Sequence, residues 1–355
     1  MSDRDEQLGW AGAPGHDDDV RYAVDGPLGR VRLHRPQAIN ALTLPMVASM
    51  HDRLTGWADD PSVRAVVVDG AGERGLCAGG DVRAVRGWVL EGRGDLADAF
   101  WRHEYSVDEL LATFPRPVVA WMDGIVMGGG VGVSAHASVR LATERTALAM
   151  PETIIGLFPD VGALHLLSRA PGELGTYAAL TATTVTGADA VALGLADAVV
   201  PSAAKDEVLA ALREDPALDA AALAELVGGE TETSSPLLDQ RPWVDECFGG
   251  DDPAAILRRL RAHPDPQAQE AARALAARSP HSVAVTLEAI RRAATMTLPQ
   301  VLAQDLVLAT HLAAHPDFAE GVRAQLVDKD RSPSWAHGSV ADVPRAEVLA
   351  AFGEG

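Results

Sequence analysis

Three consecutive glycines at residues 128–130 are the feature that most constrains how this chain folds and what it binds. They lead into a run of small and apolar residues, 131–137, that is typical of a buried helix. Without Cβ atoms, the backbone can adopt positive φ and a ligand can approach its N–H groups directly. A helix that starts there points unpaired N–H groups and a partial positive charge at that ligand. Close helix packing also explains a glycine run, so the glycines alone leave two interpretations open.

Two carboxylates, Glu152 and Asp160, follow the glycines closely. Backbone donors next to carboxylates suit acyl chemistry, in which a carbonyl oxygen gains charge and an acid or base must be near it. A dinucleotide-binding interpretation competes, because Gly130-x-Gly132-x-x-Ala135 fits the loose fingerprint and Glu152 follows about 20 residues later. The spacing argues against it, because residues 123–127 separate the glycines from the predicted strand at 118–121, whereas a Rossmann glycine turn follows its strand directly.

The composition excludes several classes of partner. A net charge of −20 argues against nucleic acid and against anionic membrane surfaces. The two cysteines imply no disulfide framework, so we expect a cytoplasmic protein, with no leader and no membrane span. We expect no metal, because the sequence holds no H-E-x-x-H motif and no paired C-x-x-C motif.

The pattern along the chain predicts an α/β protein in three parts. Residues 1–19 read as a disordered acidic tail, 20–235 as the α/β core and 236–355 as a helical region. Short strands, glycine loops and helices recur in the core, which indicates stacked ββα units. Strand-like runs flank a Gly-Pro-Leu-Gly turn at residues 26–29 and predict a hairpin. In the last part, a capping residue precedes a proline at Asp252, Asp265 and Ser279, which predicts three helix starts.

The short apolar run at residues 65–70, with β-branched Val67 and Val68, predicts a buried strand. A second glycine-rich loop follows this strand and contains Cys77-Ala78-Gly79-Gly80-Asp81. It offers another backbone N–H group, although a plain strand-to-helix turn explains it as well. Cys77 reads as a small buried residue, because no adjacent histidine or positive charge would lower the pKa of its thiol. Glu104 lies in a predicted helix at 95–111, where a solvated carboxylate is the ordinary interpretation.

The chain resembles the enoyl-CoA hydratase/isomerase (crotonase) superfamily, and within it the 3-hydroxyisobutyryl-CoA hydrolase branch. Four segments carry the resemblance together: Cys77-Ala78-Gly79-Gly80-Asp81, Met127-Gly128-Gly129-Gly130, Met150-Pro151-Glu152 and Phe158-Pro159-Asp160-Val161. The resemblance extends from about residue 20 to 335 and includes residues 318–324 and 328–330. It implies a crotonase-like spiral of stacked ββα units with a helical C-terminal region.

The resemblance also implies roles. The N–H groups of Gly80 and Gly129 would form an oxyanion hole for a thioester carbonyl, with Gly128 beside them. The loop around Ala78 would lie near the adenine of coenzyme A, and Glu104, Ala78, Asp81 and Gly128 would contact the substrate. Arg32, Arg35 and Arg74 are candidates for binding the phosphates of coenzyme A. Coenzyme A enters as part of the substrate, and no separate cofactor is expected. Homo-oligomers are common in the superfamily, although a helical C-terminal addition can block or replace the contact between subunits.

One departure separates the branches of the superfamily. Hydratases use a second glutamate three residues after the central oxyanion-hole glycine, and here that position is Gly132. The resemblance therefore implies thioester hydrolysis, most closely of 3-hydroxyisobutyryl-CoA in valine catabolism, with Glu152 and Asp160 as the catalytic carboxylates. Glu152 would attack the carbonyl or activate water, and both routes remain open. The alternatives are an enoyl-CoA hydratase/isomerase and a non-catalytic acyl-CoA-binding protein.

Overall fold

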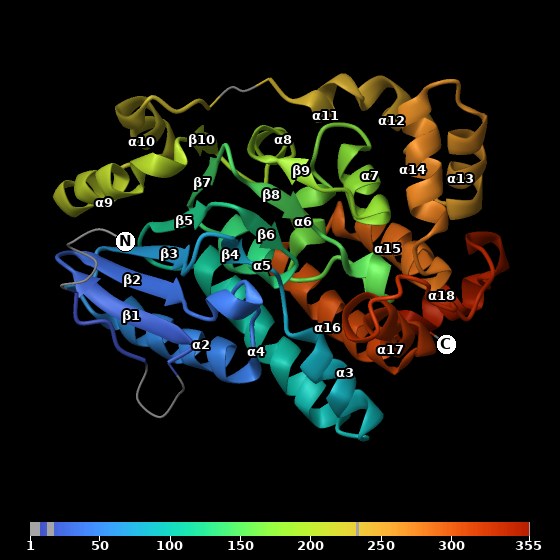
Figure 1. Ribbon diagram of the computed structural model, residues 1–355, viewed down its shortest axis with the longest axis horizontal. Coiled ribbons are helices and arrows are strands. Elements are labelled where there is room, and N and C mark those ends of the chain that lie inside the picture. The colour runs from blue at the N-terminus through green and yellow to red at the C-terminus, as the bar shows by residue number, and fades with distance from the viewer. Residues whose placement is uncertain (1–7, 13–17, 232–233, 355) are drawn as a thin grey trace. The chain divides into compact units, whose positions relative to one another are not determined.

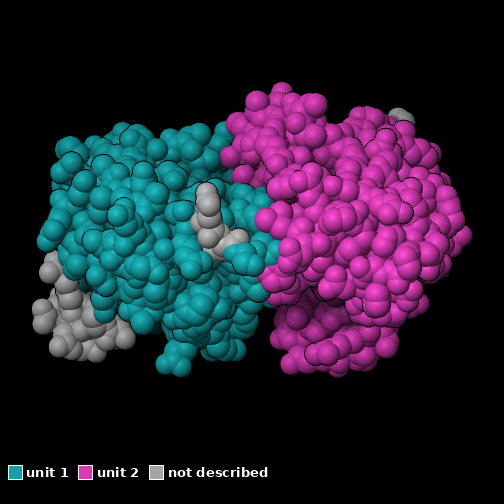
Figure 2. Space-filling model, turned by 90° about the horizontal axis from the view of Figure 1, so that it is seen from above, with its two compact units in different colours: residues 1–80, 103–148, 185–235 teal, residues 81–102, 149–184, 236–355 magenta. Residues whose placement is uncertain are grey.

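The computed structural model describes residues 8–12, 18–231 and 234–354 (Figure 1). The chain divides into two compact units, each built from separate stretches of sequence (Figure 2). Unit 1 comprises residues 1–80, 103–148 and 185–235, and unit 2 comprises residues 81–102, 149–184 and 236–355. Unit 1 ends at residue 235, and the chain from residue 236 onward belongs to unit 2. Two earlier stretches, residues 81–102 and 149–184, also belong to unit 2 although they were expected in the core.

Within the described residues, two sheets form the framework of unit 1. The first has the strand order β1-β2-β3-β5-β7-β10 and the second has the order β4-β6-β8-β9. The strands are β1 (Val20–Asp25), β2 (Leu28–Leu33), β3 (Ala65–Gly70), β4 (Gly75–Cys77), β5 (Val118–Met122), β6 (Ile125–Met127), β7 (Val139–Thr143), β8 (Ala147–Ala149), β9 (Val185–Thr186) and β10 (Ala198–Val200).

Successive turns of the chain contribute one strand to each sheet. The pairs β3 and β4, β5 and β6, and β7 and β8 each cross from the first sheet to the second. Strands β2, β3, β5, β7 and β10 pair in parallel, and β1 and β2 form the predicted antiparallel hairpin. This repeated crossing confirms the expected spiral of stacked ββα units.

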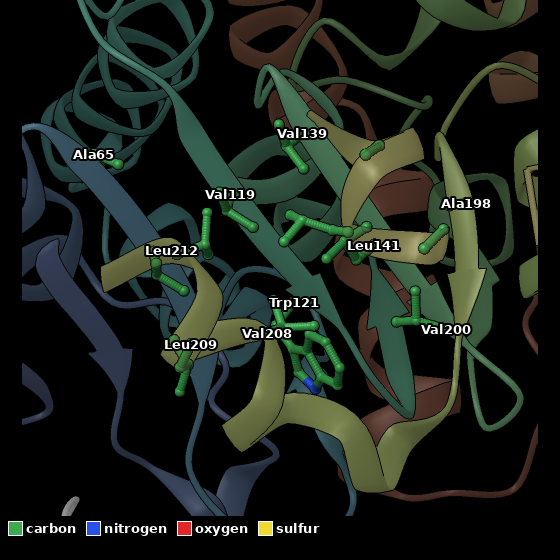
Figure 3. Packing of buried hydrophobic residues seen from close by; sticks show 14 of the residues in the cluster. Ala65, Val119, Trp121, Val139, Leu141, Ala198, Val200, Val208, Leu209 and Leu212 are labelled. Carbon is green, nitrogen blue, oxygen red and sulfur yellow. The ribbon is translucent and has the colours of Figure 1, made fainter. Parts of the chain in front are cut away.

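Helices flank the sheets of unit 1. They are α2 (Leu44–Asp59), α5 (Gly129–Ala135), α8 (Gly187–Ala192), α9 (Lys205–Glu214) and α10 (Ala220–Val227), with short 3-10 turns η1 (Pro36–Ala38) and η3 (Ser202–Ala204). Figure 3 shows Val208, Leu209 and Leu212 of α9 among Val119 and Trp121 of β5. Because alternate side chains of a strand share a face, the β-branched residues of these strands and the leucines of the helix form one buried cluster.

Unit 2 is mainly helical. Its elements are α3 (Val82–Leu90), η2 (Glu152–Ile155), α6 (Ala163–Leu167), α7 (Leu174–Thr181), α11 (Pro236–Asp239), α12 (Arg241–Phe248), α13 (Pro253–Ala262), α14 (Pro266–Ala276), α15 (Pro280–Ala293), α16 (Leu298–Ala314), α17 (Pro316–Val322), a π-turn η4 (Arg323–Val327), η5 (Val340–Asp342) and α18 (Arg345–Ala351). Helix α4 (Gly94–Ala112) contributes to both units. The predicted caps are confirmed, since Asp252, Asp265 and Ser279 accept backbone hydrogen bonds at the starts of α13, α14 and α15.

Part of the stretch expected to be a disordered tail is ordered. Ala11 exchanges two backbone hydrogen bonds with Tyr22, and the guanidinium of Arg32 lies 4.4 Å from the ring centre of Trp10. The rest of that prediction falls on residues 1–7 and 13–17, which lie outside the described residues. Among the helices described, none has the length and apolar character needed to cross a bilayer.

A fully buried carboxylate, Asp69 at the end of β3, gathers three cations in unit 1. Its oxygens lie 2.8 Å from Arg30 Nη2, 2.6 Å from Arg32 Nε and 2.9 Å from Lys205 Nζ. Burial acts to raise the pKa of Asp69, but Lys205, Arg32 and Arg30 together hold it well below its usual range. Asp69 therefore ties β2 and α9 to the centre of the sheet as an ionised group.

We expect Asp69→Asn to lower the free energy of unfolding by about 3–5 kcal/mol, because the amide leaves buried cations without a counter-charge. The depressed folded-state pKa means that this stabilisation is complete above about pH 4 and is lost as the pH falls further. Chemical denaturation from pH 3 to 7 measures both effects. The control is Asp52→Asn on α2, where loss of an exposed carboxylate should change the free energy of unfolding by less than about 0.5 kcal/mol. Equal losses in both variants would contradict this role for Asp69.

Candidate active site

The two predicted glycine loops meet in unit 1. Strands β4 and β6 pair in parallel, so the loops that follow them leave the same edge of the second sheet. A Cβ atom on Gly130 would lie 2.5 Å from the carbonyl oxygen of Cys77, which real Cβ atoms do not tolerate. Gly128 adopts φ 51° immediately before α5 and therefore also needs to be glycine. The glycines thus serve close packing of two backbones.

The same packing brings Gly80 and Gly129 together. A Cβ atom on Gly129 would lie 3.4 Å from the amide nitrogen of Gly80, so the two backbones border one small space. Gly129 is the first residue of α5, a position whose N–H group has no partner inside its own helix. Both glycines named for the oxyanion hole are therefore neighbours in unit 1.

Glu104 reaches the same place from α4. Its side chain is only 2% exposed, and a Cβ atom on Gly129 would lie 2.3 Å from its Oε1 atom. The ordinary interpretation of Glu104 as a solvated carboxylate is therefore wrong.

Burial, together with the negative charge of Glu104, raises the pKa of the Cys77 thiol to about 12. Cys77 is thus a buried neutral thiol, as the sequence predicted.

Ala78 and Asp81, in the loop that follows β4, each form a hydrogen bond that fixes the local backbone. The N–H group of Ala78 donates to the carbonyl of Ile39 at 2.9 Å, which fixes the loop after β4. Asp81 caps α3 in unit 2 by accepting from the N–H group of Ala84 at 3.4 Å. Contact of Ala78 and Asp81 with coenzyme A stays a prediction.

In unit 2, Glu152 is the first residue of η2 and is 7% exposed. The N–H groups of Gly156 and Leu157 both donate to its backbone carbonyl. The next carbonyl, that of Thr153, accepts from the N–H group of Ser279 at 3.1 Å. The backbone that carries the Glu152 carboxylate is therefore fixed on both sides.

Asp160, also 7% exposed, belongs to unit 2 as well. Val161 and Gly162 follow it in the left-handed region, at φ 53° and 70°. The carboxyl group of Asp305 on α16 accepts a hydrogen bond from the N–H group of Gly162 at 2.9 Å. Sequence reasoning missed Asp305. The available signal was a single charged residue on an otherwise apolar face of a helix.

Three basic residues were candidates for binding the phosphates of coenzyme A, and each has a partner in unit 1. Arg32 is bound to Asp69, Arg35 donates to the carbonyl of Ala41, and Arg74 donates to the carbonyls of Pro36 and Gln37. A cavity of about 680 Å³ lies at the end of β3, and its basic lining consists of Arg21, Arg32, His34 and Lys205. Arg32 is the candidate that borders this cavity.

A histidine cluster in unit 2 resembles a set of metal ligands. The Nε2 atoms of His281 and His315 lie 3.7 and 3.4 Å from Oε1 of Glu347. However, the two rings are stacked, with their centres 4.2 Å apart and an angle of 13° between their planes. Because each nitrogen lone pair lies in the plane of its ring, the lone pairs of the two rings lie in nearly parallel planes and do not converge on one point. His315 Nδ1 also accepts from the N–H group of Asp317, which puts the proton of the neutral ring on Nε2. The arrangement favours hydrogen bonding to Glu347 over metal ligation.

Comparison with known proteins gives consistent results. Residues 28–352 match the family model described as enoyl-CoA hydratase/isomerase. The mitochondrial 3-hydroxyisobutyryl-CoA hydrolase of Rattus norvegicus is 36% identical over 92% of this chain and 86% of its own length. The human enzyme of that name is 34% identical over 93% and 87%.

Solved structures match the fold along almost the whole chain. A carnitinyl-CoA dehydratase from Mycobacterium thermoresistibile has a TM-score of 0.89 and 46% identity, covering 95% of this chain and 96% of its own. An enoyl-CoA hydratase from Rhodobacter sphaeroides 2.4.1 has a TM-score of 0.88 and 38% identity, covering 94% and 97%. With the glycine loops and the spiral of ββα units, these matches show that the chain belongs to the enoyl-CoA hydratase/isomerase family and has its crotonase-like fold.

Proposed function

We propose that this protein hydrolyses a short-chain acyl-CoA thioester, with 3-hydroxyisobutyryl-CoA as the first substrate to test. The observation that carries the proposal is the adjacency of Gly80 and Gly129, which suits two backbone N–H donors directed at one oxygen. The relatives named 3-hydroxyisobutyryl-CoA hydrolase support the choice of substrate, because they match more than nine-tenths of this chain.

The proposed chemistry is acyl transfer to water. An oxygen nucleophile adds to the thioester carbonyl, the carbonyl oxygen becomes negative, and the carbon–sulfur bond then breaks to release coenzyme A and the free acid. Backbone donors directed at the developing charge contribute about 3 kcal/mol each to transition-state stabilisation. Gly80 and Gly129 would serve as these donors.

The proposal assigns the carboxylates to the remaining steps. Glu152 would either attack the carbonyl, giving an anhydride that water then cleaves, or remove a proton from the attacking water. Asp160 would orient the water or protonate the leaving sulfur. Each side chain is largely buried within unit 2, which strengthens its interaction with nearby charge. The two routes for Glu152 give the same products.

Hydration of an enoyl-CoA is the second candidate function. The solved structures described as a dehydratase and a hydratase favour it, as does the position of Glu104. Gly132 leaves α5 without a carboxylate, but Glu104 supplies one beside Gly129 from α4. A crotonase-type hydration needs two carboxylates around one water molecule, and Glu104 is the residue that would provide the second.

A paired assay separates these functions. We expect release of free thiol from 3-hydroxyisobutyryl-CoA without hydration of crotonyl-CoA. Glu152→Gln should lower kcat at least about 100-fold, because the amide can neither attack nor accept a proton. Glu270→Gln, at an exposed carboxylate of unit 2, is the control and should be unaffected. Hydration without thiol release would replace the proposal with the second candidate, and binding without turnover would indicate a non-catalytic acyl-CoA-binding protein.

The role of Gly129 gives a second prediction. In Gly129→Ala the new methyl group meets Oε1 of Glu104 and intrudes beside the amide of Gly80, so kcat should fall on the order of 100- to 1,000-fold. Steady-state kinetics with a melting curve separates lost activity from lost folding. Gly56→Ala is the matched control: its methyl group would meet nothing within 4 Å in helix α2 and should stabilise the fold by about 0.5–1 kcal/mol without changing kcat. Full activity in Gly129→Ala would exclude an oxyanion hole at this glycine.

A further inference from the structure

The turn after Asp160 has an unfavourable backbone conformation. Val161, a fully buried β-branched residue, has φ 53°, and Gly162 follows at φ 70°. Branched side chains are rare in the left-handed region, because Cβ crowds the backbone there. Such a conformation persists only where the surrounding structure enforces it, and these sites cluster around functional residues.

Asp305 is the residue that binds this turn. It lies on the face of α16 that also carries Val301, Leu302 and Leu308, and its side chain is fully buried. Oδ2 accepts the hydrogen bond from the N–H group of Gly162 at 2.9 Å, whereas Oδ1 meets no hydrogen-bond donor among the residues that the structure describes. A buried carboxylate with a single hydrogen bond is far less favourable than the neutral acid.

The electrostatic surroundings also favour the neutral acid. Burial raises the pKa of Asp305 well above its ordinary value; the hydrogen bond from Gly162 opposes that rise, and the negative charge of Asp160 adds to it. Two carboxyl groups that interact in this way do not both ionise readily, and one of them retains its proton. Asp305, with no exposed surface and one hydrogen bond, is the group whose pKa is raised.

Other ionisable groups on the elements packed against α16 are engaged elsewhere. In α3, Arg83 and Arg86 donate to the carbonyls of Leu326 and Ala319, and in α18, Arg345 pairs with Glu288 and Glu347 with three histidines. In α17, Asp317 accepts from Ser279 and Ala336, and Glu320 pairs with Arg323. In α4, Asp98 accepts a hydrogen bond from the hydroxyl of Thr310 of α16. His165 of α6 has a pKa lowered by burial and Arg169, and His311 of α16 has a pKa lowered by burial and His315.

We propose that Asp305 is a positioning residue for Asp160: as an uncharged carboxylic acid it fixes the turn at Val161 and Gly162 and adds no second negative charge beside Asp160. The inference rests on the proposed role of Asp160 in thioester hydrolysis. Asp305 acts through the backbone of the turn, and Asp160 remains the group that meets the substrate.

Two substitutions separate the hydrogen bond from the charge. Asp305→Asn keeps an oxygen acceptor for Gly162 and is neutral at every pH, so kcat at pH 7 should stay within about threefold of the wild-type value. Asp305→Ala removes the acceptor, and the relaxed turn should lower kcat on the order of 100-fold with little change in KM. Leu308→Ala, a buried apolar change on the same helix, is the control for a purely structural defect and should lower Tm without this loss of kcat. Equal kcat in the asparagine and alanine variants would overturn the proposal.

The pH profile tests the charge. Wild-type activity should decline at alkaline pH as Asp305 ionises beside Asp160, and that decline should be absent in Asp305→Asn and retained in Leu308→Ala. An unchanged alkaline decline in Asp305→Asn would show that Asp305 does not govern Asp160, and would overturn the inference.

A thermal measurement gives the same test without substrate. The folded wild-type protein retains a proton that the unfolded chain releases above about pH 4, so its stability relative to Asp305→Asn should fall as the pH rises through the folded-state pKa. The difference in Tm between wild type and Asp305→Asn should therefore change as the pH rises from 5 and become constant above the folded-state pKa. A constant difference would overturn the inference even if thioester hydrolysis is confirmed, and a shifting difference would support a protonated Asp305 even if hydrolysis fails.

Discussion

Backbone lies directly against backbone where residues 128–130 meet residues 77–80, and the paired amides of the candidate site depend on this contact. A Cβ atom on Gly130 would lie 2.5 Å from the Cys77 carbonyl oxygen, and one on Gly79 would lie 3.2 Å from the Met127 carbonyl oxygen. The parallel pairing of β4 with β6 brings the two loops to this contact. Any side chain there would separate the strands or displace the loops. The glycines that allow the second sheet to form therefore also place the two amides.

Features with a local cause were predictable from the sequence. Val66, Val67 and Val68 in a short apolar run gave strand β3, and the capping residues before prolines gave the starts of α13 to α15. The alternation of strand, glycine loop and helix gave the stacked ββα units. In each case the residues that determine the structure lie within a few positions of the structure they determine.

Features that depend on distant residues were not predictable in this way. A glutamate between aromatic residues on a helix reads as solvated, and only the packing of α4 shows Glu104 to be buried beside Gly129. The bond from Arg86 in α3 to the carbonyl of Ala319 in α17 joins residues 233 positions apart. Such contacts place residues 81–102 in unit 2, although no local pattern marks that stretch as different from its neighbours.

Comparison of two fully buried aspartates, Asp69 and Asp305, shows why burial alone does not determine the state of a carboxyl group. Asp69 and Asp305 both have no exposed surface. Asp69 meets two arginines and a lysine, and their charges outweigh the cost of removing the carboxylate from water. Asp305 meets one N–H group and the negative charge of Asp160, so that cost is not offset. The same side chain thus serves as an ionised tie within a sheet and as a neutral hydrogen-bond acceptor beneath a strained turn, and the charges around it decide which.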